Sequence, residues 1–278
     1  VTAGWQERES EVDELSDHLD CGVEQLELYR RAEEIAEQDG ELVAALRDRQ
    51  QRLRRLQNLY RRRLGHHLAM VRELLADTAE DGLLDPERRD AIEDVRALDA
   101  HHLERVRRVH DEFEEHWRPS RREAVARHRG EIAEILARCD ALVIAGGHVA
   151  VLLNRLRLFD LVPMLEHTPV VAWSAGAMVL SECIVLFHDS PPQGAGNAEI
   201  LDSGLGLCPG IIPLPHARER LRLDDPLRVT LFAMRFAPSR SVVLERGSRL
   251  DWSGDRWSAA PGTVWLGPEG SLETVGEE

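Results

Sequence analysis

The stretch that decides the fold is Pro169-Val170-Val171-Ala172-Trp173-Ser174-Ala175-Gly176-Ala177-Met178. Apolar β-formers lead up to one serine, small residues follow it, and helical spacing then resumes, so the order predicts strand, tight turn and helix. A serine in such a turn exposes its Oγ at the carboxyl edge of a sheet, beside the N–H groups that open the helix. The alternative is an ordinary strand-to-helix turn, because Ala172 stands where the usual G-x-S-x-G elbow has glycine.

The composition is typical of a globular protein with a strongly acidic surface. The 278 residues suffice for one large or two medium domains, with 43% hydrophobic and 31% charged residues. The net charge of −15 disfavours binding to nucleic acid and to anionic membranes. The four cysteines form no C-x-x-C pair, which predicts neither a zinc knuckle nor a disulfide framework. Without a secretion signal or an apolar run of about 18 residues, we expect a cytoplasmic protein with no membrane span and no cofactor.

Residues 1–130 are predicted to form an all-α hairpin or bundle. Apolar residues at helical spacing run from Val12 to a break at Asp39-Gly40, and with heptad-like, coiled-coil spacing from Leu42 to Leu75. A third helix restarts with Asp85 as N-cap and Pro86 at its first position, and reaches Trp117. Two long helices joined by a short turn predict an antiparallel hairpin, and a further helix is expected over roughly 120–138.

Two features of these helices have alternative interpretations. His66-His67 and His101-His102 lie at comparable distances from the hairpin turn, but no carboxylate completes a ligand set, so we predict no metal site. A cluster of arginines between Arg47 and Arg63 fits either nucleic-acid phosphates or ion pairs with the acidic residues between Glu7 and Asp17, and we favour the ion pairs.

The composition changes at Ala141, and residues 131–278 are predicted to form an α/β domain. Short apolar runs predict buried strands at 141–145, 169–173, 184–187 and 211–216. Later runs at 241–245, 249–252, 263–266 and 271–275 alternate with Gly turns and predict a β-rich tail.

Three side chains at predicted strand ends make a candidate catalytic set. A serine needs a base, and the base needs an anion that holds its tautomer. Asp189 follows one apolar run and His216 ends the next extended segment, so the chain order is Ser174, Asp189, His216, as in α/β-type hydrolases. The N–H groups of Ala175 and Gly147 are candidates for an oxyanion hole.

Three stretches of the chain match motifs of one known family: Ala145-Gly146-Gly147-His148, Trp173-Ser174-Ala175-Gly176-Ala177, and Gly204-Leu205-Gly206-Leu207 leading to Pro215-His216. Together they resemble the peptidase family of aspartyl dipeptidase (peptidase E) and cyanophycinase. The resemblance covers residues 131–278. It implies a class I glutamine-amidotransferase-like fold with a mostly parallel sheet, and serine in place of cysteine as the nucleophile.

The resemblance also implies an activity, a serine peptidase that acts on a small peptide beside acidic residues through an acyl-enzyme. Arg220 and Arg222, with Arg218 as a third candidate, match the arginines that follow the family's histidine, and a guanidinium binds a carboxylate through two parallel hydrogen bonds. His148 stands where the family has Asn or Asp, so we expect it to contact substrate differently.

One departure from the family bears on the N-terminal half. The family begins with a βαβ half before its Gly-Gly strand, and long helices replace it in this chain. An exposed sheet edge then has to be covered by the helical hairpin or by a second subunit. The alternative to a hydrolase is therefore a non-catalytic amidotransferase-like domain in an adaptor, which binds a protein partner or a second copy through its helices.

Overall fold

The computed structural model describes residues 22–79, 82–187, 196–267 and 270–276. The chain forms two compact units, and each unit is built from two segments that are separated in the sequence. Unit 1 contains residues 1–51 and 109–179, and unit 2 contains residues 52–108 and 180–278. The predicted boundary between residues 130 and 131 stays a prediction.

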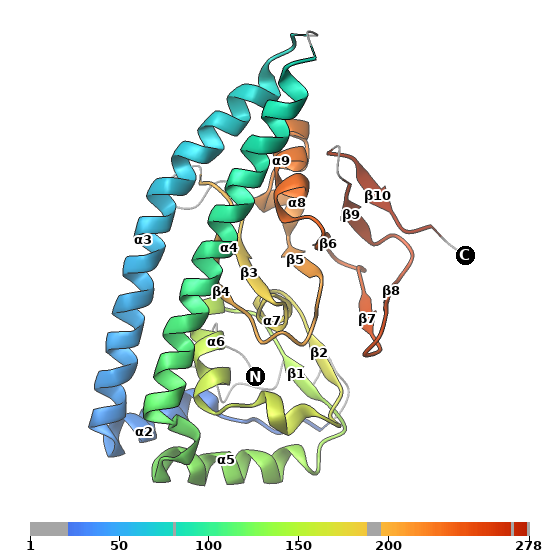
Figure 1. Cartoon of the computed structure of the whole chain (residues 1–278). Helices are drawn as coiled ribbons and strands as arrows, with labels where there is room; N and C mark the ends of the chain where they lie inside the picture. Colours follow the sequence, from blue (N-terminus) through green and yellow to red (C-terminus); the bar gives the residue numbers. More distant parts are fainter. Residues whose placement is uncertain (1–21, 80–81, 188–195, 268–269, 277–278) are drawn as a thin grey trace. The chain divides into compact units, whose positions relative to one another are not determined.

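Unit 1 combines helices with one pair of strands (Figure 1). Its core includes Ile35, Ile132 and Leu152, which are almost completely buried, and α2 lies against α5 and α6. Its elements are α2 (Leu28–Gln38), the start of α3 (Gly40–Ala76), the end of α4 (Leu84–Trp117), the 3₁₀ turn η2 (Pro119–Arg121), α5 (Glu123–Leu136), β1 (Leu142–Ile144), α6 (Val149–Leu158), the 3₁₀ turn η3 (Val162–Leu165), β2 (Val170–Ala172) and most of α7 (Ala175–Leu180).

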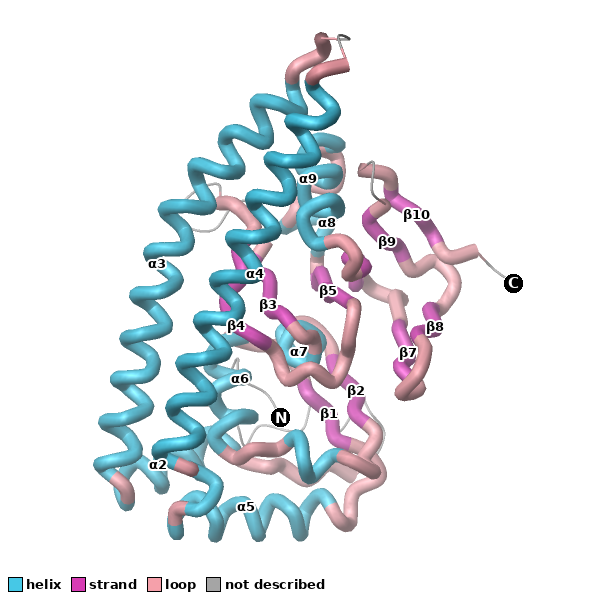
Figure 2. Tube along the Cα trace, viewed as in Figure 1, coloured by secondary structure: helices cyan, strands magenta, loops and turns pink. Residues whose placement is uncertain are grey.

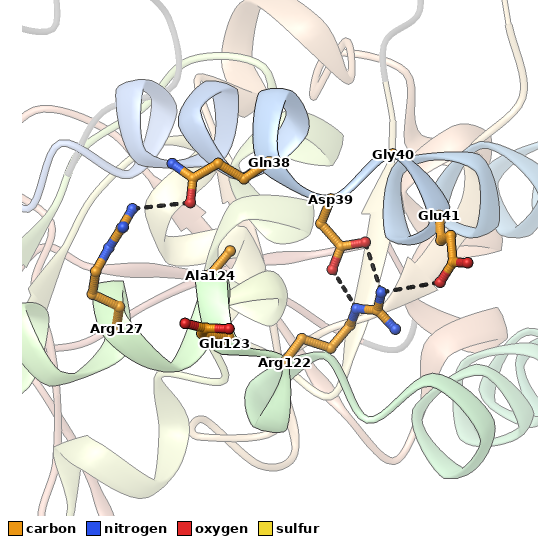
Figure 3. A pocket seen from close by; sticks show the side chains of 8 residues that line it. All are labelled: Gln38, Asp39, Gly40, Glu41, Arg122, Glu123, Ala124 and Arg127. Atoms are coloured by element: carbon orange, nitrogen blue, oxygen red, sulfur yellow. Dashed lines mark hydrogen bonds and ion pairs between the residues drawn. The ribbon is translucent and has the colours of Figure 1, made fainter.

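The corner between α2 and α3 is fixed by paired charges (Figure 3). Asp39 caps α3 by accepting the Leu42 N–H at 3.0 Å, and its carboxylate also accepts two hydrogen bonds from Arg122, one of them at 2.7 Å. That guanidinium lowers the pKa of Asp39. The groove here measures about 910 Å³, and its facing charges largely neutralise one another, so we interpret it as a structural junction.

Unit 2 places a helical hairpin beside a second group of strands (Figure 2). Residues 52–76 of α3 and 84–108 of α4 are antiparallel, since Tyr60 stacks on His102 while the later Leu74 carbonyl accepts from the earlier Arg88 at 2.9 Å. The remaining elements are β3 (Cys183–Leu186), β4 (Glu199–Ser203), β5 (Ile211–Pro215), α8 (Ala217–Arg220), α9 (Pro226–Phe236), β6 (Arg240–Leu244), β7 (Leu250–Trp252), β8 (Trp257–Ala259), β9 (Val264–Leu266) and β10 (Leu272–Thr274).

The strands confirm an α/β fold, and their pairing is mixed. Parallel pairing joins β1 to β2 and β5 to β6. Strands β9 and β10 continue this second sheet antiparallel from β6, and β3–β4 and β7–β8 are antiparallel pairs. Among the described residues, two of the six strand pairings are parallel, so the small sheets are mixed and differ from the mostly parallel sheet that the resemblance implies.

A buried polar network joins α3, α4 and α9 inside unit 2. Arg235 donates to Asp99 from Nε at 2.6 Å and from Nη2 at 2.8 Å. The Tyr60 hydroxyl donates to Asp99 at 2.7 Å and accepts from Arg235 at 2.8 Å. Burial raises the pKa of Tyr60, so its phenol stays protonated and can donate. The network therefore consists of one satisfied ion pair and one neutral hydroxyl.

His102 extends this network through Gln57. Its Nε2 lies 3.0 Å from Gln57 Oε1, which requires the Nε2–H tautomer because the Gln57 amide NH₂ donates elsewhere. Burial lowers the pKa of His102, although nearby carboxylates partly oppose the shift. The ring is therefore neutral near pH 7.

We expect His102 to make the protein less stable in mild acid. An unfolded histidine takes up a proton near pH 6.5, whereas the folded ring resists protonation until lower pH, so the free energy of unfolding falls as pH drops below about 6.5. Urea denaturation of His102→Phe, measured from pH 7 to 5, is expected to show a shallower pH dependence than the wild type. The exposed neighbour supplies the control, His101→Phe, and equal slopes in wild type and His102→Phe would contradict the expectation.

Most predicted helices and strands are present, and the starts of two helices are corrected. Helix α2 begins at Leu28, and residues 22–27 are not helical; positions 12–21 of that prediction lie outside the described residues. Helix α4 begins at Leu84, so Asp85 lies inside its first turn and is not the N-cap. His102 lies opposite Gln57 and Tyr60, more than one helical turn from His66, so the histidine pairs do not meet. The predicted acidic partners of the arginine cluster, between Glu7 and Asp17, lie outside the described residues, so this pairing stays a prediction, and Arg61 of the cluster pairs with Glu199.

Candidate functional site

Two strand-to-helix turns leave the same edge of the β1–β2 pair. The strands are parallel, with Leu142 opposite Val170 and Ile144 opposite Ala172. The N–H of Trp173 extends the ladder by donating to the Ile144 carbonyl at 3.2 Å. Because both strands end there, the glycine turn after β1 and the serine turn after β2 lie side by side.

Ser174 occupies the turn in a left-handed backbone conformation, with φ 53°. Helix α7 follows at once, since Gly176 N–H donates to the Trp173 carbonyl at 2.9 Å and Met178 N–H to the Ser174 carbonyl at 3.3 Å. A left-handed non-glycine residue is strained, and such strain gathers at functional sites. The strand, turn and helix predicted around Ser174 are therefore present.

Two glycines allow the chain to pass this turn closely. A Cβ at Gly146 would lie 2.9 Å from both Cβ and Oγ of Ser174, and a Cβ at Gly176 would lie 2.1 Å from the Ile144 carbonyl oxygen. Gly146 thus forms one wall beside the hydroxyl. This role of Gly146 was not predicted from the sequence, although the Gly-Gly pair directly after a predicted strand could have indicated it.

We expect Gly146→Ala to impair the serine far more than the fold. The new methyl group would displace the hydroxyl, and a displacement of about 1 Å from a reactive geometry costs on the order of 100-fold in rate. Acylation of Ser174 by a fluorophosphonate probe measures this rate. Gly65→Ala, whose Cβ meets nothing within 4 Å, is the control. An unchanged acylation rate in Gly146→Ala would show that the wall is not needed.

The turn after β1 continues into an exposed histidine. Gly147 has φ 121°, which side chains rarely adopt. His148 then caps α6, its Nδ1 accepting the Val151 N–H at 3.4 Å. An Nδ1 that accepts leaves Nε2 protonated, so the exposed edge of this ring is a hydrogen-bond donor.

His216 lies at the end of a buried strand in unit 2. All residues of β5 are buried, whereas His216 is exposed. Its backbone is left-handed, with φ 57°, and its N–H donates to the Leu244 carbonyl at 3.2 Å. His216 is thus the second left-handed non-glycine residue at the end of a parallel strand, and its imidazole is exposed.

The arginines predicted to bind substrate lie at the end of α8 and just after it. Arg220 is half-buried and Arg222 is exposed, with φ 56°. Asp225, which follows them in the sequence, caps α9 by accepting the Arg228 N–H at 3.1 Å.

The structure thus brings the predicted residues together in two groups. Gly147, His148, Ser174 and Ala175 lie on the two turns of unit 1, and His216, Arg220 and Arg222 lie on the β5–α8 segment of unit 2. Asp189 lies outside the described residues. The catalytic triad and the oxyanion hole therefore stay predictions.

Two of the three described thiols are poor nucleophiles. Cys139, Cys183 and Cys208 are free. Burial raises the pKa of Cys183 to about 12 and that of Cys208 to about 11, so both stay protonated near neutral pH. In the described part of the chain, no three His, Cys, Asp or Glu side chains gather as a metal site. Every helix of that part is too short or too polar to cross a bilayer.

A left-handed serine between a parallel strand and a helix is the arrangement in which serine hydrolases of the α/β type present their nucleophile. A family model described as peptidase family S51 matches residues 95–243, more than half of the chain and all three candidate catalytic positions. The chain therefore belongs to peptidase family S51, the serine peptidase family of aspartyl dipeptidase and cyanophycinase. A search of curated proteins finds no matching relative.

Proposed function

We propose that this chain hydrolyses a small peptide next to an acidic residue, with Ser174 as the nucleophile of an acyl-enzyme. One observation carries the proposal: a left-handed serine follows a parallel strand, with Gly146 against its hydroxyl, in a chain of a serine peptidase family. The finer fold assignment, a class I glutamine-amidotransferase-like domain over residues 131–278, belongs to the same proposal.

In this mechanism His216 removes the Ser174 hydroxyl proton as Oγ bonds to the scissile carbonyl carbon. Asp189 accepts a hydrogen bond from the other ring nitrogen and holds the tautomer. The N–H groups of Gly147 and Ala175 donate to the oxyanion. The C–N bond then breaks as His216 returns the proton to the leaving amine. Water repeats these steps on the ester, which releases the acid and restores the serine.

Substrate selection is assigned to the cationic segment after His216 and to His148. Arg220 and Arg222 bind the carboxylate of an acidic side chain, an interaction that a guanidinium makes with two parallel hydrogen bonds. His148 donates from Nε2, because its Nδ1 is engaged at the start of α6. The fluorophosphonate and dipeptide experiments below test the nucleophile and the selectivity separately.

The first experiment treats the full chain with a fluorophosphonate probe and maps the adduct by mass spectrometry. We expect one adduct, on Ser174, that is lost in Ser174→Ala and kept in the exposed control Ser258→Ala. An adduct that survives Ser174→Ala would overturn the assignment. The absence of any adduct on the wild type would favour the non-catalytic adaptor, which binds a partner or a second copy through residues 1–130.

The second experiment compares hydrolysis of aspartyl and asparaginyl dipeptides with the same second residue. We expect the aspartyl peptide to be cleaved faster, and Arg220→Gln to reduce this preference by about tenfold, the loss of one charge-assisted contact. Arg246→Gln, on the loop after β6, is the control. Equal rates for the two peptides in the wild type would overturn the acidic specificity while leaving the nucleophile in place.

A further inference from the structure

One stretch of α3 is cationic in a chain that is acidic as a whole. Residues 49–72 contain eight arginines and no aspartate or glutamate, whereas the whole chain carries 50 acidic and 35 basic residues. Glutamate is a good helix former and supports a helix when it lies four residues from an arginine. Helix formation therefore does not account for the absence of acids from this stretch.

Several of these arginines share one side of the helix with two exposed apolar residues. Steps of three and four residues bring successive side chains to the same face, and one such row lies within unit 2. Every member of the row is exposed, whereas Leu53, Tyr60 and Leu64 on the other side of α3 are buried. The row, about 27 Å long, is called the cationic row below. It consists of Arg52, Arg55, Leu59, Arg62, His66 and Met70, with Arg63 beside it.

The fold does not use the charges of the cationic row. Within the part of the chain that the structure describes, Arg55, Arg62 and Arg63 form no ion pair, and all three are exposed. Arg61 lies on another side of α3 and donates to the Glu199 carboxylate at 2.5 and 2.6 Å. An arginine of α3 that serves the fold is thus paired inside unit 2, whereas those of the row face solvent.

The apolar members of the row narrow the chemistry of its partner. Leu59 and Met70 are 45% and 40% exposed, and large apolar side chains at a charged surface are typical of a protein contact. A helix with apolar residues at steps of three and four, and carboxylates on both flanks, matches both features at the same spacing. We propose that the cationic row binds an acidic amphipathic helix of a partner protein. Its apolar side chains pack on Leu59 and Met70, and its carboxylates accept hydrogen bonds from Arg55, Arg62 and Arg63.

An acidic helix suits this row better than nucleic acid or an anionic membrane. Both of those are extended polyanions, and the chain's net charge of −15 repels them outside the row. A helix about 10 Å wide covers the row alone. Two apolar side chains are also too few for the continuous apolar face with which a helix enters a membrane surface. The inference is independent of the proposed hydrolase activity.

The test measures, by fluorescence anisotropy, the binding of a labelled synthetic helix to the full chain. The peptide has three heptads, with Leu at a, Ala at d, Glu at e and g, and Gln elsewhere. The double variant Arg55→Gln, Arg62→Gln is expected to weaken binding about tenfold, the effect of two exposed ion pairs. The matched control, Arg246→Gln with Arg256→Gln, removes the same charge from two exposed residues outside α3 and is expected to bind as the wild type does.

A second variant separates helix docking from charge attraction alone. Leu59→Gln keeps every charge and is expected to weaken binding about fivefold, because an apolar contact is lost. The control is Leu272→Gln on β10, where the leucine is 44% exposed. A peptide with Lys in place of Glu is expected not to bind.

Several results would overturn the proposal. One is a wild type that does not bind the peptide, or an Arg55→Gln, Arg62→Gln or Leu59→Gln variant that binds it equally well. Tighter binding of phosphatidylserine vesicles or single-stranded RNA by the same arginines would assign the row to a polyanion. A dimer that dissociates in Arg55→Gln, Arg62→Gln would assign it to a second copy. Binding that appears only after the acids between Glu7 and Asp17 are replaced by Gln would assign it to the chain's own residues.

Discussion

Gly176→Ala is expected to destabilise unit 1 by roughly 3 kcal/mol or more, at the upper end of the cost of overpacking. The new Cβ would lie 2.1 Å from the Ile144 carbonyl oxygen and 2.7 Å from that of Ala145. Both atoms belong to backbone at the end of β1, so no side chain can move aside. Helix α7 has to withdraw from β1, and the turn that presents Ser174 moves with it. Urea denaturation measures the loss, and probe acylation of Ser174 is expected to fall below detection.

Gly130→Ala supplies the control for this experiment. Gly130 is an exposed residue of α5 in the same unit, and a Cβ there meets nothing within 4 Å. Alanine in a helix interior is favoured over glycine by about 0.5–1 kcal/mol, so this variant is expected to be slightly more stable. A Gly176→Ala protein as stable as wild type would mean that α7 packs less closely on β1 than described.

The region around Ser174 could be predicted because its determinants are local. Small residues on both sides of a serine, after a β-branched run, leave few conformations other than a strand-to-helix turn. The same holds for His216, since the apolar run Ile211–Pro215 forms β5 and ends at the histidine. In both cases the sequence pattern spans fewer than ten residues.

Elements that depend on distant partners were not predicted. Strand β4 carries Glu199 and Asp202, and its pattern does not read as a strand, yet pairing with β3 and bonds from α3 satisfy its backbone. The Tyr60–Asp99–Arg235 network joins residues 39 and 136 positions apart, and no sequence spacing signals such a contact. Helix α9 was also missed, although Asp225 before Pro226 is an N-cap followed by proline at the first position.

These contacts give the helical hairpin a defined role within unit 2. A chain with helices in place of the family's first βαβ half is expected to cover an exposed sheet edge with its hairpin or with a second subunit. For β4 the answer is α3, whose Gln57 and Tyr60 bond to Ile200. The family match also begins at residue 95, inside α4, so family membership itself extends into the hairpin. A hairpin bonded to a strand in this way is an integral part of the unit that carries His216.

Arg235→Met is expected to cost about 3–5 kcal/mol of unfolding free energy, the cost of leaving one partner of a buried ion pair alone. Asp99 would keep only the Tyr60 hydroxyl, in a site where its side chain is 8% exposed. The exposed control is Arg240→Met, which loses one cation–π contact with Trp265 and about 0.5–1 kcal/mol.

A second substitution identifies the cause of the loss, because Arg235→Met leaves the buried Asp99 carboxylate without its cation. The double variant Asp99→Asn, Arg235→Met removes the charge and should recover part of the loss at pH 7. A loss below about 1 kcal/mol, outside the range for a broken buried pair, would mean that water reaches Asp99 and that the network is not sealed.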